Sequence, residues 1–321
     1  MTALPRRTFL KRAAAGSLAV AGFRALTRSA AAEQPQQRKF TMDLNCGMIG
    51  VRAGLRESIL LAQRHGFESV APSLDALAKL SDGELQGLLA DLKASKLVWG
   101  ASGLSVDFRG DEAKFAAGLK ALPTLAKAAE RAGVVRINTW LTPCHASLTY
   151  LANFRQHAQR LREVAKVLAD HGQRLGLEYV GPKTSWTAGR YPFLHTMAEM
   201  KDLIGEIGLT NVGFLLDSWH WHHAGETQAD LLTLRSQDVV ACHLNDAPAD
   251  TPKDQQKDGS RELPCATGVI DLKAFLSGLV QIGYDGPICA EPFYKPLREM
   301  PAEQALTTTA AAMKKAIALL E

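Results

Sequence analysis

The sequence predicts one α/β domain in which eight parallel strands close into a (β/α)8 barrel. Strand-like apolar runs alternate with amphipathic helical stretches from residue 40 onward, giving eight strand-and-helix units. Such an order implies parallel strands joined by right-handed crossovers. Four of the apolar runs also end in a side chain of a type that binds metals. A doubly wound open sheet is the alternative, but no glycine-rich phosphate loop follows the first strand, at residues 45–50.

The bulk composition fits a chain with a substantial core and argues against a nucleic-acid partner. Of 321 residues, 46% are hydrophobic and 22% are charged, and the net charge is only +4. No basic run is interleaved with aromatic residues. The five cysteines are odd in number and lack CxxC spacing, so neither a disulfide framework nor a thiolate zinc site is expected.

The first 32 residues carry the features of an export signal rather than of a fold. Arg6 and Arg7 precede an apolar, alanine-rich run, and Ala30 to Ala32 offer a small-residue cleavage site. This pattern predicts a twin-arginine signal peptide at 1–32, a polar linker at 33–39 and a barrel at 40–321. It also predicts passage through the twin-arginine export machinery, a periplasmic location and no stable membrane insertion after cleavage. The alternatives are a basic N-terminal tail and an uncleaved anchor.

The remaining elements follow from hydrophobic spacing and from cap and breaker residues. The predicted strands are 40–45, 68–72, 97–103, 134–140, 175–178, 212–216, 239–243 and 286–291. The predicted helices are 55–65, 81–95, 111–132, 150–171, 197–207, 228–236, 271–282 and 301–320. Pro123 is expected to divide the 111–132 region into two helices.

The strand ends predict a metal site. The apolar run 212–216 ends at Asp217, and three further runs end at Glu178, His243 and Glu291. In a barrel the carboxyl ends of the strands form one face, so these side chains should surround one point. Three carboxylates and one imidazole suit Mn²⁺, Mg²⁺ or Co²⁺, with Zn²⁺ also compatible. The alternative is that each acid caps a helix and that His243 is a core residue.

Five short motifs resemble the sugar phosphate isomerase/epimerase branch of the xylose isomerase-like TIM barrel superfamily, and the resemblance covers about residues 40 to 320. The motifs lie at 177–178, 216–220, 243–246, 268–271 and 290–292. By resemblance to the ketose 3-epimerases, Glu178, Asp217, His243 and Glu291 bind one divalent ion, with Mn²⁺ preferred. The resemblance also implies that Glu178 and Glu291 are the catalytic proton carriers and that His220 lies near the substrate.

The chemistry that these parts serve is proton removal from a carbon next to a carbonyl, which creates an enediolate. A metal chelated by the substrate oxygens shares that charge, and two carboxylates can take and return the proton. The expected function is a sugar isomerase or epimerase acting on an unphosphorylated sugar or keto-sugar. The alternative with the same site is a lyase, dehydratase or hydratase acting on a keto-sugar, cyclitol or 3-keto-glycoside. A non-catalytic sugar-binding barrel is a third reading. A DNA-repair nuclease is a fourth, but the extra histidines of that class are missing.

The substrate-binding candidates are Asn45, Lys183 and Asp246, together with His220. Two departures from the epimerase pattern put a ketohexose substrate in doubt. Thr184 stands where those enzymes carry a glutamate, and Ala249 stands where they carry an arginine. The long polar loop 247–265 is read either as a lid or oligomer contact, compatible with a homo-oligomer, or as a solvated insertion.

Overall fold

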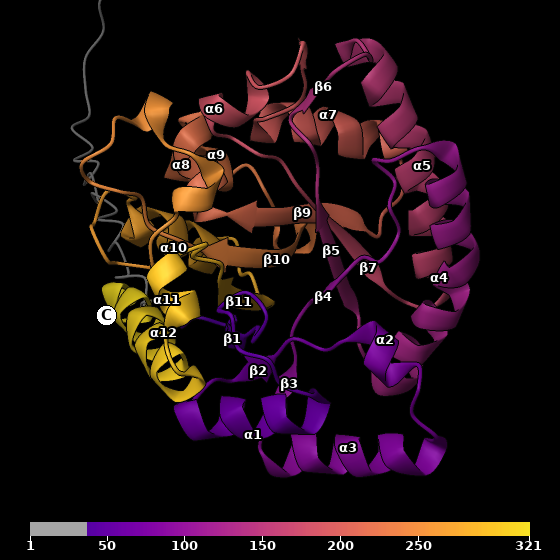
Figure 1. Cartoon of the computed structure of the whole chain (residues 1–321), viewed down its shortest axis with the longest axis vertical. Coiled ribbons are helices and arrows are strands. Elements are labelled where there is room, and N and C mark those ends of the chain that lie inside the picture. Colours follow the sequence, from indigo (N-terminus) through magenta and orange to yellow (C-terminus); the bar gives the residue numbers. More distant parts are fainter. Residues whose placement is uncertain (1–36) are drawn as a thin grey trace, which may run out of the picture. The chain divides into compact units, whose positions relative to one another are not determined.

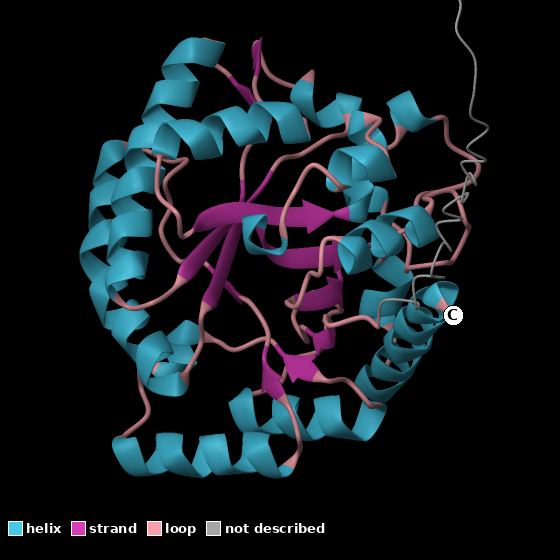
Figure 2. Ribbon diagram, turned by 180° about the vertical axis from the view of Figure 1, so that it is seen from behind, coloured by secondary structure: helices cyan, strands magenta, loops and turns pink. Residues whose placement is uncertain are grey.

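The computed structural model describes residues 37–321, which form a barrel of parallel strands inside a ring of helices (Figure 1, Figure 2). The predicted signal peptide and most of the predicted linker lie outside the described residues. Along residues 37–321, no helix is both long enough and apolar enough to span a bilayer.

The barrel strands pair in the order β3-β2-β1-β11-β10-β9-β7-β5-β4, and every pairing is parallel. Their bounds are β1 Thr41–Leu44, β2 Ser69–Val70, β3 Val98–Trp99, β4 Ser102–Gly103, β5 Arg136–Trp140, β7 Arg174–Glu178, β9 Val212–Asp217, β10 Val239–Leu244 and β11 Pro287–Ala290. A separate antiparallel pair joins β6 Cys144–His145 to β8 Tyr191–Pro192.

The ring closes through the predicted third strand, which the structure divides into β3 and β4. β3 pairs with β2 and β4 pairs with β5, so one chain segment joins both ends of the sheet. Gly100 lies at this break, and a Cβ there would stand 2.2 Å from Oδ1 of Asp43. The close approach explains why glycine is used at this position. Counted this way, the described chain has the eight barrel strands that the sequence predicts.

The helices surround the strands (Figure 1). Their bounds are α1 Leu55–His65, α2 Leu74–Leu77, α3 Asp82–Ala94, α4 Glu112–Ala132, α5 Tyr150–Asp170, α6 Lys183–Trp186, α7 Met197–Ile207, α8 Ser218–Ala224, α9 Gln228–Leu231, α10 Leu272–Gln281, α11 Lys295–Glu299 and α12 Ala302–Ile317. The 3-10 turns are η1 Ser236–Asp238, η2 Lys253–Gln255, η3 Asp258–Ser260 and η4 Ala318–Leu320. Ser81 and Glu84 form a capping box at the start of α3, which lies within the predicted helix 81–95.

Two helix predictions were wrong. Pro123 does not divide the 111–132 region, because α4 continues through it. A proline removes one N–H bond, and the buried Leu122 and Ala126 on either side hold both halves against the barrel. The predicted helix 228–236 ends at Leu231. There, turn bonds from Thr233 N to Asp230 O (3.2 Å) and from Leu234 N to Leu231 O (2.9 Å) redirect the chain toward β10.

A buried histidine gives the fold a testable dependence on pH. His157 in α5 is 3% exposed, lies between the rings of Phe108 and Phe193, and donates its Nδ1–H to Asn153 O at 2.9 Å. Burial lowers its pKa to about 4, against the opposing effect of the Asn153 carbonyl. The unfolded chain therefore binds this proton first, and stability is lost as the pH falls from about 6.5 toward 4.

We expect His157→Phe to remove part of the acid sensitivity of the protein. Between pH 7 and pH 5 the wild type should lose about 2 kcal/mol more unfolding free energy than the variant does. Urea unfolding of both proteins at the two pH values measures this difference. An equal loss in both would show that His157 does not carry the effect.

Candidate metal centre

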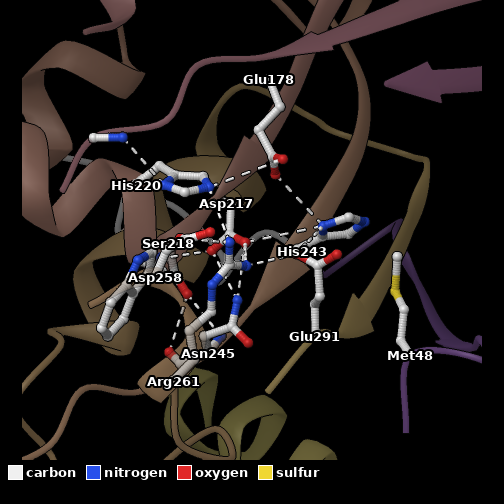
Figure 3. Close-up of polar contacts among 12 residues, drawn as sticks. Met48, Glu178, Asp217, Ser218, His220, His243, Asn245, Asp258, Arg261 and Glu291 are labelled. Atoms are coloured by element: carbon white, nitrogen blue, oxygen red, sulfur yellow. Dashed lines mark hydrogen bonds and ion pairs between the residues drawn. The ribbon is translucent and has the colours of Figure 1, made fainter. Parts of the chain in front are cut away.

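Four side chains meet at the carboxyl ends of four neighbouring strands. Glu178 ends β7, Asp217 ends β9, His243 lies near the end of β10, and Glu291 directly follows β11. One ligand atom from each lies within 4.8 Å of the others. Figure 3 shows Glu178 and Glu291 approaching from opposite sides, with His243 and Asp217 near the middle. The convergence predicted from the sequence is confirmed, while the role of each residue stays a prediction.

Asp217 has the most hydrogen-bond partners in this cluster. Its Oδ1 accepts from Trp219 N at 2.7 Å, which caps α8, so the helix-cap alternative holds for this residue as a second role. Asn245 Nδ2 lies 2.9 Å from both oxygens of the carboxylate. Ser218 and Asn245 exchange two further bonds, of 2.8 and 3.0 Å, which fix the loop after β10 against α8. The carboxylate orientation is therefore set by several neighbours.

His220 lies beside the cluster, and its place near a substrate, which the resemblance implied, stays a prediction. It is 1% exposed, and its Nε2 is 3.9 Å from Glu178 Oε2. Its Nδ1 faces the backbone N–H of Gly181 at 3.2 Å. A Cβ at Gly181 would stand 2.5 Å from His220 O, so this close approach requires glycine.

Arg261 is the site residue that sequence reasoning missed. It is 2% exposed and comes from the 247–265 loop. Its Nη1 donates to Asp217 Oδ2 at 2.8 Å and to Glu291 Oε2 at 2.5 Å, and its Nη2 donates to Asp258 Oδ1 at 2.9 Å. In Figure 3 the guanidinium lies among the acidic side chains. The only sequence signal was an arginine inside a polar loop, which gives no information on where that loop folds.

The acidic side chains differ in their pKa. Burial, together with the charges of Glu291 and Asp217, raises the pKa of Glu178 to about 8, although His243 opposes the shift. Burial also raises the pKa of Glu291, but His243 and Arg261 outweigh it and lower the value to about 2. Burial lowers the pKa of His243, but Cys289 and Glu291 outweigh it and raise the pKa above its ordinary value. A cation in the cluster would favour the ionised form of each carboxyl group and the neutral form of the imidazole, so it would oppose the pKa shifts of Glu178 and His243 and add to that of Glu291.

The residues present fit a divalent cation. Ligand atoms bound at about 2.1–2.4 Å to one ion lie no more than about 4.2–4.8 Å apart, which the cluster satisfies. Oε1 of Glu178 is buried and accepts no hydrogen bond from any described residue, so an oxygen ligand is free on one side. Three carboxylates are crowded into one buried cluster, and a divalent ion would balance two of their negative charges.

The other predicted substrate residues lie around the cluster rather than in it. Asn45 lines a small cavity that Asp43, Asn138 and His243 also line. Lys183 is half-exposed and pairs with Asp254 at 2.8 Å, outside the cluster. Asp246 is fully buried and accepts from four backbone N–H groups, those of residues 247, 267, 268 and 270. Its contacts hold a loop together, and its role toward a substrate stays a prediction, as do those of Asn45 and Lys183.

The 247–265 loop is folded onto the barrel, so the solvated-insertion reading was wrong. Its base is closed by paired backbone bonds between Asp246 and Glu262, of 2.8 and 2.9 Å. Gln256 is 2% exposed and bonds to two carbonyls of the same loop. Thr184, one of the departures from the epimerase pattern, donates to Gln256 O at 2.7 Å and joins the loop to α6.

The three acids and the histidine at the carboxyl ends of its strands place this protein in the class of (β/α)8 barrels with a candidate metal site. Comparison with known proteins is consistent with that class. The family model described as xylose isomerase-like TIM barrel matches residues 59–316, so the chain belongs to that family.

Individual relatives agree with this assignment. A xylose isomerase domain protein from Alicyclobacillus acidocaldarius is 33% identical, with a TM-score of 0.75 over 88% of this chain and 99% of that one. The solved IOLI protein with a bound zinc atom is 21% identical, with a TM-score of 0.72 over 87% of this chain and 98% of that one, a likeness of fold. An inosose isomerase from Bacillus velezensis is 28% identical over 48% of this chain and 52% of that protein. The chain thus spans about half the length of the curated inosose isomerases it matches.

Proposed function

We propose that the protein is a divalent-metal-dependent isomerase or epimerase that acts on an unphosphorylated keto-sugar or a cyclitol ketone. One observation carries the proposal: Glu178 ends β7 and Glu291 follows β11, the outer two of four neighbouring strands, and Asp217 and His243 come from the two strands between them. One ligand atom from each of the four residues lies within 4.8 Å of the others. Two acids on either side of one binding point are what proton removal and return require. The similarity to inosose isomerases supports a cyclitol ketone among the candidate substrates.

In this proposal the chain supplies the ligands, the base and the acid. Glu178, Asp217, His243 and Glu291 would hold the ion, which when bound would polarise the substrate's carbonyl oxygen and share the charge of the enediolate. One glutamate removes the proton from the carbon next to the carbonyl, and the other delivers a proton to the same or the adjacent carbon. Asn245 and Ser218 keep the Asp217 carboxylate in place.

A dehydratase is the second candidate, and one observation favours it. A 3-dehydroshikimate dehydratase from Pseudomonas aeruginosa is 29% identical over 45% of this chain, although over only 22% of that larger protein. The same enediolate can expel a β-hydroxyl group in place of taking up a proton. The first step is shared, so only the product distinguishes the two reactions.

Incubation with keto-sugars and inososes in deuterated buffer, with Mn²⁺ present, tests the proposal. We expect deuterium to enter the carbon next to the carbonyl without loss of water, followed by formation of an isomer. Mass spectrometry and NMR detect both events. Loss of water from the exchanging substrate would favour the dehydratase, and absence of exchange with every ketone would contradict both candidates.

We further propose that the protein is exported by the twin-arginine pathway, on the basis of Arg6, Arg7 and the alanines at 30–32. Replacing both arginines by lysine should keep the protein in the cytoplasm, with its N-terminal segment uncleaved. Fractionation of cells that produce either form measures this. An unchanged distribution would contradict the proposal.

A further inference from the structure

The 247–265 loop carries Arg261 to the same atoms that the candidate metal site uses. Arg261 Nη1 donates to Oδ2 of Asp217 and to Oε2 of Glu291. Those two oxygens also face His243 Nδ1, at 3.9 and 3.2 Å, and Glu178 Oε1 lies 3.5 Å from the same nitrogen. A guanidinium and a divalent ion on the same two oxygens would lie within a few ångströms of each other, where two cations repel strongly because little water screens them.

The position of Arg261 also leaves its own polar neighbours poorly matched. Gly181 N–H donates to Nδ1 of His220, so the ring proton of neutral His220 lies on Nε2. Arg261 Nη2 is 3.1 Å from that same Nε2, so two donors face each other. Arg261 Nε is buried and has no hydrogen-bond partner in the described part of the chain. The guanidinium is therefore well paired with Asp217 and Glu291, while its Nε–H has no acceptor and its Nη2 faces another donor on His220.

The attachment of the loop allows Arg261 to leave without unfolding the barrel. Asp258, which accepts from Arg261 Nη2, belongs to the same loop and would move with it. The other contacts of the loop do not include Arg261: the Lys183 pair with Asp254 is half-exposed, Thr184 donates to Gln256 O, and the Asp246–Glu262 bridge lies at the base. Cζ of Arg261 also lies 4.4 Å from the centroid of the Phe293 ring, and Phe293 follows β11 rather than belonging to the loop.

We propose that Arg261 and the divalent cation compete for Asp217 Oδ2 and Glu291 Oε2, so that Arg261 sets the affinity of the site for metal. Binding of the cation releases Arg261 and loosens the 247–265 loop, and insertion of the loop weakens cation binding by the same factor. This inference rests on the metal site of the proposed function, but not on the reaction. In the metal-free protein, Arg261 is the cation that neutralises the carboxylates of Asp217 and Glu291.

Mn²⁺ binding to Arg261→Met, measured by competition with a chelator, tests the competition. We expect at least about tenfold tighter binding than in the wild type, because the ion no longer displaces a paired guanidinium. Arg298→Met is the matched control. Arg298 lies near the same Phe293 ring (5.7 Å) but donates to Met48 O and contacts no ligand atom, so its loss should change the affinity less than about twofold.

Hydrogen exchange of the wild type provides a second readout that does not depend on a variant folding. Saturating Mn²⁺ should speed the exchange of backbone amides between residues 253 and 262. Slower or unchanged exchange there would overturn the competition, as would equal or weaker Mn²⁺ binding by Arg261→Met. If the wild type and Arg261→Met bind Mn²⁺ equally, the metal site is supported and the competition is contradicted. If neither binds it, the metal site of the proposed function falls too.

Discussion

Glu178→Gln and Glu291→Gln should each reduce the exchange of the substrate's carbon-bound hydrogen with solvent by at least about 100-fold, the usual contribution of a positioned acid or base. Glutamine keeps the shape of each side chain but can neither take nor return a proton. The two glutamates approach the cluster from opposite sides (Figure 3), so neither is placed to replace the other. The assay follows deuterium in the substrate found by the ketone screen.

Because both residues are also predicted ligands, the rates must be measured at saturating Mn²⁺, with its binding followed separately. Glu262→Gln is a matched control: Glu262 lies at the base of the 247–265 loop, outside the cluster, and should keep normal exchange. Exchange at the wild-type rate in both Glu178→Gln and Glu291→Gln would falsify their role in proton transfer.

Asp217→Asn should lower the free energy of unfolding by roughly 3 kcal/mol, even with chelator present. Asp217 accepts from Trp219 N, Asn245 Nδ2 and Arg261 Nη1, and it is fully buried. An amide of the same shape turns one acceptor into a donor, and it removes a counter-charge from the buried Arg261. Breaking one partner of a buried ion pair typically costs about 3–5 kcal/mol, and here Glu291 still neutralises part of the charge.

A double variant separates the ion pair from the rest of the Asp217 contacts. If the cost arises from the stranded guanidinium, Asp217→Asn combined with Arg261→Met should be more stable than the sum of the single changes predicts. Denaturant unfolding of the wild type, both single variants and the double variant gives this coupling. Additive effects, or a loss below about 1 kcal/mol in Asp217→Asn alone, would contradict the pairing.

The sequence was sufficient for the barrel and for the ligand cluster because both follow from local rules. Apolar runs such as 212–216 predict buried parallel strands, and parallel strands bring their carboxyl ends to one face. Asp217, His243 and Glu291 therefore fall together without any knowledge of loop structure. The helix 197–207 was predicted to the residue, and in the structure Thr196 and Gly208 cap its two ends.

Other features depend on long-range contacts that have no sequence period. Arg261 reaches Asp217 across 44 residues, and the 247–265 loop around it has 3-10 turns rather than a helix or strand. The continuity of α4 through Pro123 comes from packing of Leu122 and Ala126, which outweighs a local breaker. Lys183 looked available for a substrate, but its partner Asp254 comes from the same loop.

The most direct test of the account is a crystal structure of the Mn²⁺-soaked protein with anomalous diffraction data collected at the manganese edge. We expect one strong peak per chain, within about 2.0–2.4 Å of atoms from Glu178, Asp217, His243 and Glu291. A well-occupied peak elsewhere, with these four side chains still bound only to Arg261 and to one another, would contradict the proposed metal centre and the chemistry that depends on it.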